Sequence, residues 1–149
     1  MDISFYLDEH LITFLTASDK YEAVSQLIDK AYECKKINDK VAFFEAIKAR
    51  EEIVSTGIGL GVAIPHAKLS PSQPFFLGIG VQQGKGIDWG SLDHSLVKII
   101  FIIGGPNNQS TEYLKILSRL TSAIKEESNR IKLLQASSTQ EVLSIVSQF

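Results

Sequence analysis

One segment of the chain gathers residue types that can carry out phosphoryl transfer. Residues 50–67 read REEIVSTGIGLGVAIPHA, with Arg50 at the start and His66 near the end. An imidazole can take up a phosphoryl group, and a guanidinium binds phosphoryl oxygens through a planar fork of N–H donors. The proline before His66 and the glycines at 57, 59 and 61 allow the backbone to approach a ligand closely and to hold one side chain in a set direction. We therefore expect Arg50 and His66 to lie together in a phosphoryl-transfer site.

Other familiar sites are excluded by spacing. The glycines do not form a dinucleotide fingerprint, because they follow a helical pattern and no helix begins after them, and a P-loop is missing. No G-x-S-x-G nucleophile accompanies His66, and Cys34 falls in a helical pattern that packing explains. His10 and His94 are interpreted as solvated surface residues, and no metal-ligand spacing is present, so neither a metal nor another cofactor is expected. By spacing alone, His66 fits a structural role as well as a catalytic one.

Length, composition and charge limit the class of protein. A chain of 149 residues with 44% hydrophobic and 21% charged residues is typical of one soluble globular domain, here residues 1–149. The net charge of −2 leaves no basic excess for binding nucleic acid. The acidic N-terminus is unlike a signal peptide, the strongest apolar run is too short to span a bilayer, and a single cysteine fits a reducing compartment. We expect a cytoplasmic protein without direct membrane insertion.

The first half of the chain changes from a helical to a strand period. Apolar spacing predicts a helix capped by Ser18 and running to about Lys36, and a second helix from about residue 38 to about residue 51. Arg50 therefore stands at the end of the second helix, from which the fold can bring it back beside His66. Short apolar segments at 62–64 and 75–81 then have strand character.

The second half begins with a strand and ends with helices. The nearly continuous apolar run at 96–103 predicts a strand buried on both faces, followed by a turn at 104–108. Ser110 is then expected to cap a helix, a short helix follows at about 127–135, and a capping box at 138–141 starts a last helix that ends near residue 149. This order predicts an α/β domain in which helices cover both faces of a mixed sheet.

The segment around His66 also resembles a known family. The run STGIGLGVAIPH at 55–66, preceded by Arg50-Glu51, is similar to enzyme IIA domains of the mannitol/fructose type in the phosphoenolpyruvate-dependent phosphotransferase system. Within that group it is most similar to the nitrogen-regulatory branch. The similarity covers essentially the whole chain and includes GIDW at 86–89 and LKILSRL at 114–120.

The resemblance implies roles for particular residues. It implies that His66 is phosphorylated, that Arg50 contacts the phosphoryl group, and that a mixed sheet lies between helices. Tyr113 stands where family members commonly place a second active-site histidine, and a tyrosine hydroxyl cannot supply a positive charge near neutral pH. With a helix starting at Ser110, Tyr113 lies in its first turn, where the helix dipole favours an anion. We expect Thr56 and Tyr113 to supply neutral hydrogen-bond donors to the phosphate.

The resemblance also implies partners. A phosphohistidine carrier protein of the HPr type would donate phosphate to His66, and the acceptor or target would be a permease IIB domain or a regulatory protein. Three interpretations stay open: a regulatory module controlled by its phosphorylation, a relay of phosphate towards a sugar permease, and a binding module that has lost transfer because of Tyr113. The nitrogen-type motif and the lack of a fused permease segment favour the first. Each describes a component of a bacterial phosphotransferase system rather than a stand-alone enzyme.

Overall fold

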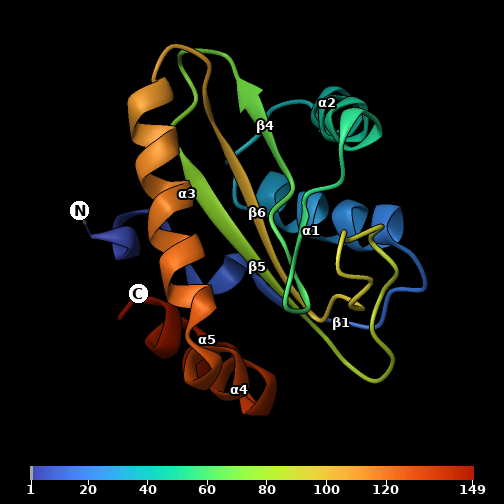
Figure 1. Cartoon of the computed structure of the whole chain (residues 1–149). Helices are drawn as coiled ribbons and strands as arrows, with labels where there is room; N and C mark the ends of the chain where they lie inside the picture. The colour runs from blue at the N-terminus through green and yellow to red at the C-terminus, as the bar shows by residue number, and fades with distance from the viewer. Residues whose placement is uncertain (1) are drawn as a thin grey trace.

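A six-stranded sheet forms the centre of residues 2–149, the part of the chain that the computed structural model describes (Figure 1). Helices precede, interrupt and follow its strands in the order that the sequence periodicity predicts. The elements, in chain order, are η1 (Ile3–Tyr6), η2 (Glu9–Leu11), β1 (Ile12–Leu15), α1 (Lys20–Glu33), α2 (Lys40–Ile53), β2 (Gly57–Gly59), β3 (Val62–Ala63), β4 (His66–Leu69), β5 (Phe76–Gln82), β6 (Ile99–Pro106), α3 (Ser110–Lys125), α4 (Glu127–Gln135) and α5 (Thr139–Val146).

The sheet is mixed, and β6 is its central strand. The strand order is β1-β5-β6-β3-β2, and β4 also pairs with β6, further along the same edge as β3. β6 runs antiparallel to β5 and parallel to β3 and β4. All eight residues of β6 are buried, which confirms the prediction of a strand covered on both faces.

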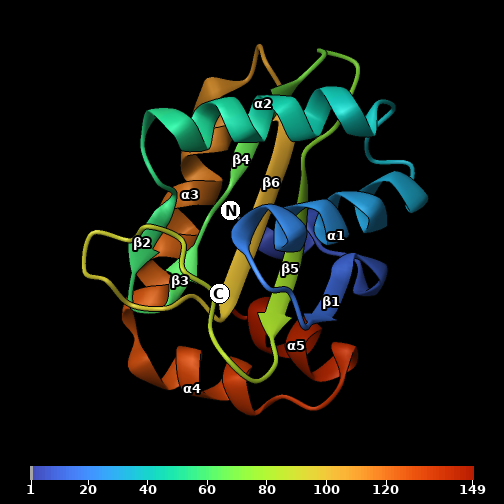
Figure 2. The same ribbon diagram turned by 90° about the vertical axis from the view of Figure 1, so that its right-hand side faces the viewer.

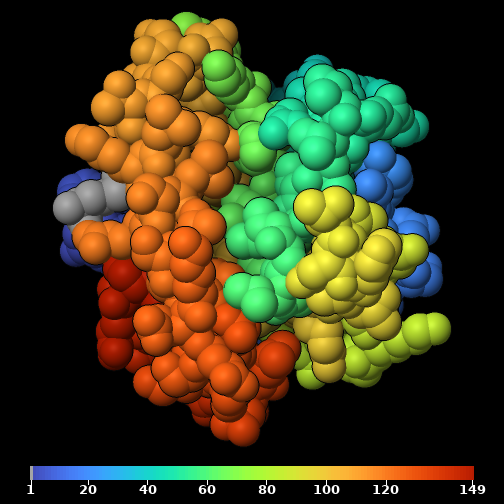
Figure 3. Space-filling model, viewed as in Figure 1, coloured from blue at the N-terminus to red at the C-terminus, as the bar shows by residue number. Residues whose placement is uncertain are grey.

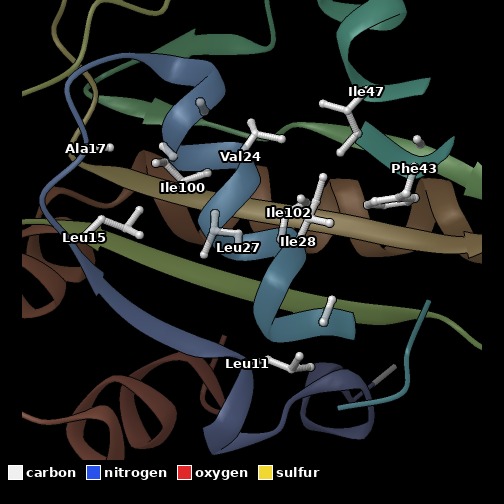
Figure 4. Packing of buried hydrophobic residues seen from close by; sticks show 14 of the residues in the cluster. Leu11, Leu15, Ala17, Val24, Leu27, Ile28, Phe43, Ile47, Ile100 and Ile102 are labelled. Atoms are coloured by element: carbon white, nitrogen blue, oxygen red, sulfur yellow. The ribbon is translucent and has the colours of Figure 1, made fainter. Parts of the chain in front are cut away.

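Helices cover both faces of this sheet, as predicted. Figure 1 shows α3 along one face and α1 and α2 on the other, and in Figure 2 α1 and α2 lie across the strands. Successive residues of β6 point to opposite faces, so Ile100 and Ile102 pack with α1 and α2 (Figure 4). Phe101 and Ile103 pack instead with α3 and α5. The two apolar clusters therefore share one strand between them.

The predicted turn at 104–108 is wrong for its first three residues. β6 continues through Gly104, Gly105 and Pro106, because β4 pairs with it as far as Pro106. The two glycines are needed for packing rather than for turning, since a Cβ at Gly104 would overlap the ring of Phe76 and one at Gly105 would overlap the ring of Phe75. The chain turns only at residues 107–108.

Two predicted helix caps are also corrected. Asp19 rather than Ser18 caps α1, because its carboxylate accepts the N–H of Glu22, while Ser18 donates to the Glu22 side chain. Ser110 is the first residue of α3 rather than its cap. The expected cap of α5 is confirmed, since the Ser138 hydroxyl accepts the N–H of Glu141 at 3.1 Å. The reciprocal bond of a capping box is displaced by one residue, because the Glu141 carboxylate accepts the N–H of Ser137 at 3.0 Å.

The sequence pattern misses three strands of the sheet, β1, β2 and β4. Each has only three or four residues, too few to show a period. β4 matters for the site because it begins at His66.

Candidate functional site

His66 is held at the start of β4 with one ring nitrogen committed. It pairs with Ile103 of β6, and its Nδ1 lies 2.8 Å from the carbonyl oxygen of Ile64. A carbonyl oxygen can only accept a hydrogen bond, so Nδ1 carries the proton and Nε2 keeps its lone pair in the neutral ring. Burial lowers the pKa of His66, and the charge of Arg50 lowers it further, against the opposite effects of the Ile64 hydrogen bond and of Glu51. Near neutral pH the half-buried imidazole is therefore uncharged, with the Nε2 lone pair free.

Arg50 lies close enough to this imidazole for its positive charge to act on it. It lies in the last turn of α2 and is half-buried, and its charge lowers the pKa of both His66 and Tyr113. Within residues 2–149 no hydrogen bond or ion pair occupies its guanidinium. A guanidinium without a carboxylate partner can receive a dianion. The structure thus places the charge of Arg50 within electrostatic reach of His66, because the β2–β3 hairpin returns the chain from the end of α2 to the start of β4.

Tyr113 packs against the His66 ring. The ring centroids of Tyr113 and His66 are 5.3 Å apart, with the planes inclined at 58°. The Tyr113 hydroxyl is buried without a hydrogen-bond partner in the described part of the chain, and burial raises its pKa well above the usual range. The hydroxyl therefore keeps its proton and has that proton to donate. The Tyr113 backbone N–H already donates to Gln109, so only the side chain is available to a ligand.

Thr56 lies close by, but its hydroxyl proton is directed away from a phosphate. The hydroxyl donates to the carboxylate of Glu51, whose other oxygen accepts the Thr56 N–H at 3.1 Å. Trp89 Nε1 donates to both the Thr56 hydroxyl oxygen (3.2 Å) and Glu51 (3.3 Å). The Thr56 hydroxyl was expected to donate to a phosphate, but in the structure it donates to Glu51. The Glu51 carboxylate is fully buried, and a buried charge is costly unless hydrogen-bond donors compensate it. Sequence reasoning missed Glu51 and Trp89 as parts of the site, although both stand within the motifs that carry the family resemblance.

The glycine run approaches another part of the protein rather than a ligand. A Cβ at Gly57 would overlap Ser91, and one at Gly59 would lie against the carboxylate of Asp93. Asp93 also accepts the Leu60 N–H at 2.9 Å, and Gly59 has φ +93°, which glycine adopts readily. The glycines therefore seat the loop between β5 and β6 on the β2–β3 hairpin. The backbone at these glycines does approach another group closely, as the sequence predicts, but that group is the loop between β5 and β6 and not a ligand.

The surface around the site is hollowed and partly apolar. Figure 3 shows a hollow between α3 and the end of α2, with the green segment that includes β4 at its floor. Large apolar side chains are exposed on the elements that border it, at the end of α2, on the hairpin and on α3: Ile53, Val54, Ile58, Leu60 and Leu114. Exposed apolar side chains that gather on one face are typical of a protein-binding surface.

Comparison with known proteins decides the family. The family model described as "Phosphoenolpyruvate-dependent sugar phosphotransferase system, EIIA 2" matches residues 5–149. The chain belongs to this family. Relatives of this EIIA include the "Nitrogen regulatory protein" of Bradyrhizobium diazoefficiens, 30% identical over 93% of this chain and 89% of the relative. The "PTS system fructose-specific EIIABC component" of Bacillus subtilis is 32% identical over 99% of this chain, which spans only 23% of that relative.

Solved structures show the same fold. The nitrogen regulatory protein IIA-Ntr of Neisseria meningitidis superposes with a TM-score of 0.89 at 28% identity, covering 97% of this chain and 98% of that one. A mannitol enzyme IIA of Escherichia coli, solved in complex with phosphorylated enzyme IIB, superposes with a TM-score of 0.79 at 19% identity, covering 96% of this chain and 98% of that one. The family and fold expected for this EIIA from its sequence are confirmed.

Two further observations concern membrane-spanning helices and groups of metal-ligand residues. Across residues 2–149, no helix is both long enough and apolar enough to pass through a membrane. In the same residues, histidine, cysteine and acidic side chains do not gather in groups of three that could hold a metal ion.

Proposed function

We propose that this EIIA is a phosphocarrier whose His66 accepts a phosphoryl group on Nε2 from the phosphohistidine of an HPr-type carrier protein. The observation that carries the proposal is the 2.8 Å hydrogen bond from Nδ1 to the Ile64 carbonyl, which leaves Nε2 as the free nucleophile. Arg50 and Tyr113 stand beside the same ring. His66, Arg50 and Tyr113 would thus provide a nucleophile, a cation and a neutral hydrogen-bond donor at one site.

The transfer exchanges one nitrogen–phosphorus bond for another. The lone pair of His66 Nε2 forms a bond to phosphorus while the bond to the donor imidazole breaks, and the departing donor nitrogen keeps the bonding electron pair. The His66 ring then carries positive charge, which the Nδ1–H bond to Ile64 stabilises. Because the transition state is loose, catalysis depends on positioning and on charge stabilisation at the equatorial oxygens. We assign that stabilisation to the Arg50 guanidinium.

Tyr113 and Thr56 have different roles in this mechanism. The protonated, unpartnered hydroxyl of Tyr113 donates a neutral hydrogen bond to a phosphoryl oxygen. Thr56 acts through Glu51 and the backbone, since its hydroxyl proton is already donated. No metal or other cofactor enters, because the donor phosphoramidate is already activated.

The exposed apolar residues bordering the hollow support a docking surface for protein partners. A donor carrier and an acceptor must each bring a reactive group to Nε2, and both would use this surface. We favour a regulatory protein as the partner controlled by phosphorylation, supported by the similarity to IIA-Ntr of Neisseria meningitidis. The second candidate is a permease IIB domain, supported by the mannitol IIA–IIB complex of Escherichia coli. We further propose that the protein acts in the cytoplasm, a reducing compartment that suits its single cysteine.

The experiment that tests this function is phosphorylation of the purified protein by phosphoenolpyruvate, enzyme I and an HPr-type carrier, read by intact mass. A gain of one phosphoryl group that is acid-labile and absent from His66→Ala supports the phosphocarrier. No gain, when a control IIA domain is labelled in parallel, would instead identify a binding module in which Tyr113 accompanies the loss of transfer.

A further inference from the structure

A buried carboxylate lies behind the proposed phosphoryl acceptor. The side chain of Glu51 is completely buried, next to Arg50 in the last turn of α2. Three donors converge on its two oxygens: the Thr56 N–H, the Thr56 hydroxyl and Trp89 Nε1. The Nζ atom of Lys20, in α1, lies 3.7 Å from Glu51 Oε2. Burying a carboxylate is costly, and apolar residues of similar volume often give equal or greater stability, so packing alone does not explain Glu51.

Hydrogen bonds connect this carboxylate to the reactive ring. Glu51 fixes Thr56 through both its N–H and its hydroxyl, and the Thr56 carbonyl accepts the N–H of Ile64 at 3.0 Å. The Ile64 carbonyl in turn accepts Nδ1–H of His66. We call this series (Glu51, Thr56, Ile64, His66) the Glu51–His66 path. It joins the end of α2 to the start of β4.

We propose that Glu51 is a positioning residue for phosphoryl transfer, which acts through Thr56 and the Ile64 carbonyl to hold His66 with Nε2 directed at the incoming phosphorus. The inference rests on the proposed function, since it assigns a purpose to the orientation of His66. Glu51 does not touch the phosphate. Its hydrogen bonds fix Thr56, whose carbonyl accepts the Ile64 N–H. Its position next to Arg50 in α2 ties the same carboxylate to the end of the helix that carries the guanidinium.

The charges around His66 predict how removal of the Glu51 carboxylate changes the pKa and the tautomer of His66. Arg50 and Glu51 face His66 from α2, Tyr113 packs on it from α3, and Lys20 of α1 stands behind Glu51. Without the Glu51 charge, the pKa of His66 falls, because Arg50 then acts unopposed. Loosening of the Ile64 carbonyl also allows the proton to move to Nε2, which removes the nucleophilic lone pair.

The test compares Glu51→Gln with Glu52→Gln. Both variants remove one negative charge from the same end of α2, but Glu52 is exposed and has no part in the Glu51–His66 path. An amide offers only one oxygen to the three donors, so Glu51→Gln must lose at least one of their hydrogen bonds. The measurements are ¹⁵N NMR of the His66 ring across pH, the rate of phosphorylation by an HPr-type carrier, and the thermal midpoint.

The expected result separates positioning from simple stabilisation. In folded Glu51→Gln we expect a mixture of His66 tautomers, a lower His66 pKa and phosphorylation slowed about tenfold or more, whereas Glu52→Gln behaves as wild type. A folded Glu51→Gln with the wild-type tautomer and rate, and a change only in thermal midpoint, would overturn the proposal. If Glu51→Gln does not fold, Thr56→Val, which removes only the hydroxyl from the path, decides instead by the same two readouts.

The ring spectrum is independent of any partner protein. If wild-type protein takes no phosphate from the carrier, the proposed phosphocarrier function fails, while the tautomer of His66 in the Glu51 variants still decides whether Glu51 orients the ring.

Discussion

The carbonyl of Ile64 accepts Nδ1–H of His66 from two residues earlier in the chain, at 2.8 Å. The intervening Pro65 has a restricted φ, and its own carbonyl accepts the N–H of Ile103 in β6 at 3.0 Å, so the acceptor is held by the sheet. We therefore expect phosphate only on Nε2. Two-dimensional ¹H–¹⁵N correlation of the phosphorylated protein distinguishes the two ring positions, and phosphate bonded to Nδ1 would contradict this tautomer.

The pH dependence follows from the lowered pKa of His66. Because the folded-state pKa lies below the unfolded value of about 6.5, the unfolded chain takes up this proton first as pH falls. The stabilisation from His66 is thus complete above about pH 6.5 and is lost as pH falls through the folded-state pKa. Urea unfolding at several pH values, with His66→Ala for comparison, measures the difference. If the difference between the two proteins does not change from pH 7 to pH 5, the pKa of His66 is not lowered.

Arg50 is expected to govern the rate of phosphorylation. Arg50→Ala should slow transfer about 100-fold, because no other cation is described beside His66, and it should raise the pKa of His66 by removing a like charge. Lys48→Ala is the matched control, since Lys48 lies on α2 with Arg50 but its ammonium lies over the Tyr21 ring of α1. Phosphorylation of Arg50→Ala at the wild-type rate would refute the assigned role.

Gly104 is expected to matter for packing. Ala at this position would overlap the ring of Phe76 and crowd Phe43, so Gly104→Ala should lower the free energy of unfolding by about 1–3 kcal/mol. In a Phe76→Leu background the same substitution should cost less, because the overlapping ring is gone. Urea denaturation of the four proteins measures the coupling. An equal cost in both backgrounds would mean that Gly104 is required for backbone conformation instead.

Periodicity in the sequence was sufficient to predict the layered fold, but not the short strands or the glycines that packing requires. The long amphipathic helices and the continuous apolar run of β6 have signals that extend over many residues. β1 and β4 have only four residues each, and the glycines at 104–105 have the composition of a turn although aromatic packing requires them. The sequence around Gly104 and Gly105 does not show that the rings of Phe76 and Phe75 pack there, because these lie 28 and 30 residues earlier in the chain.

The candidate site was predictable to a similar degree. Residue type and spacing make Arg50 and His66 candidates, and the family resemblance supplies their expected roles and singles out Tyr113. Glu51 was missed because its partners, Thr56 and Trp89, are five and thirty-eight residues away along the chain, and only the fold shows that they converge. The direction of the Thr56 hydroxyl depends on the same convergence.

Tyr113 offers the sharpest test of charge against hydrogen bonding at the site. Its hydroxyl lacks a partner in the described residues, so Tyr113→Phe should leave the unphosphorylated protein at least as stable as wild type. A hydrogen bond to a charged group contributes about 1.5–3 kcal/mol, so the same substitution should slow phosphorylation about tenfold or more.

Tyr113→His adds the positive charge that the tyrosine hydroxyl cannot supply. An imidazolium can place positive charge beside the phosphoryl oxygens, so we expect faster phosphorylation with an unchanged fold. Single-turnover transfer from a phosphorylated HPr-type carrier, followed by intact mass, measures both variants against wild type, with circular dichroism to check the fold. If Tyr113→His transfers at the wild-type rate while Tyr113→Phe is slowed, the site needs a donor here and not a cation, and the charge argument for a second histidine fails for this chain.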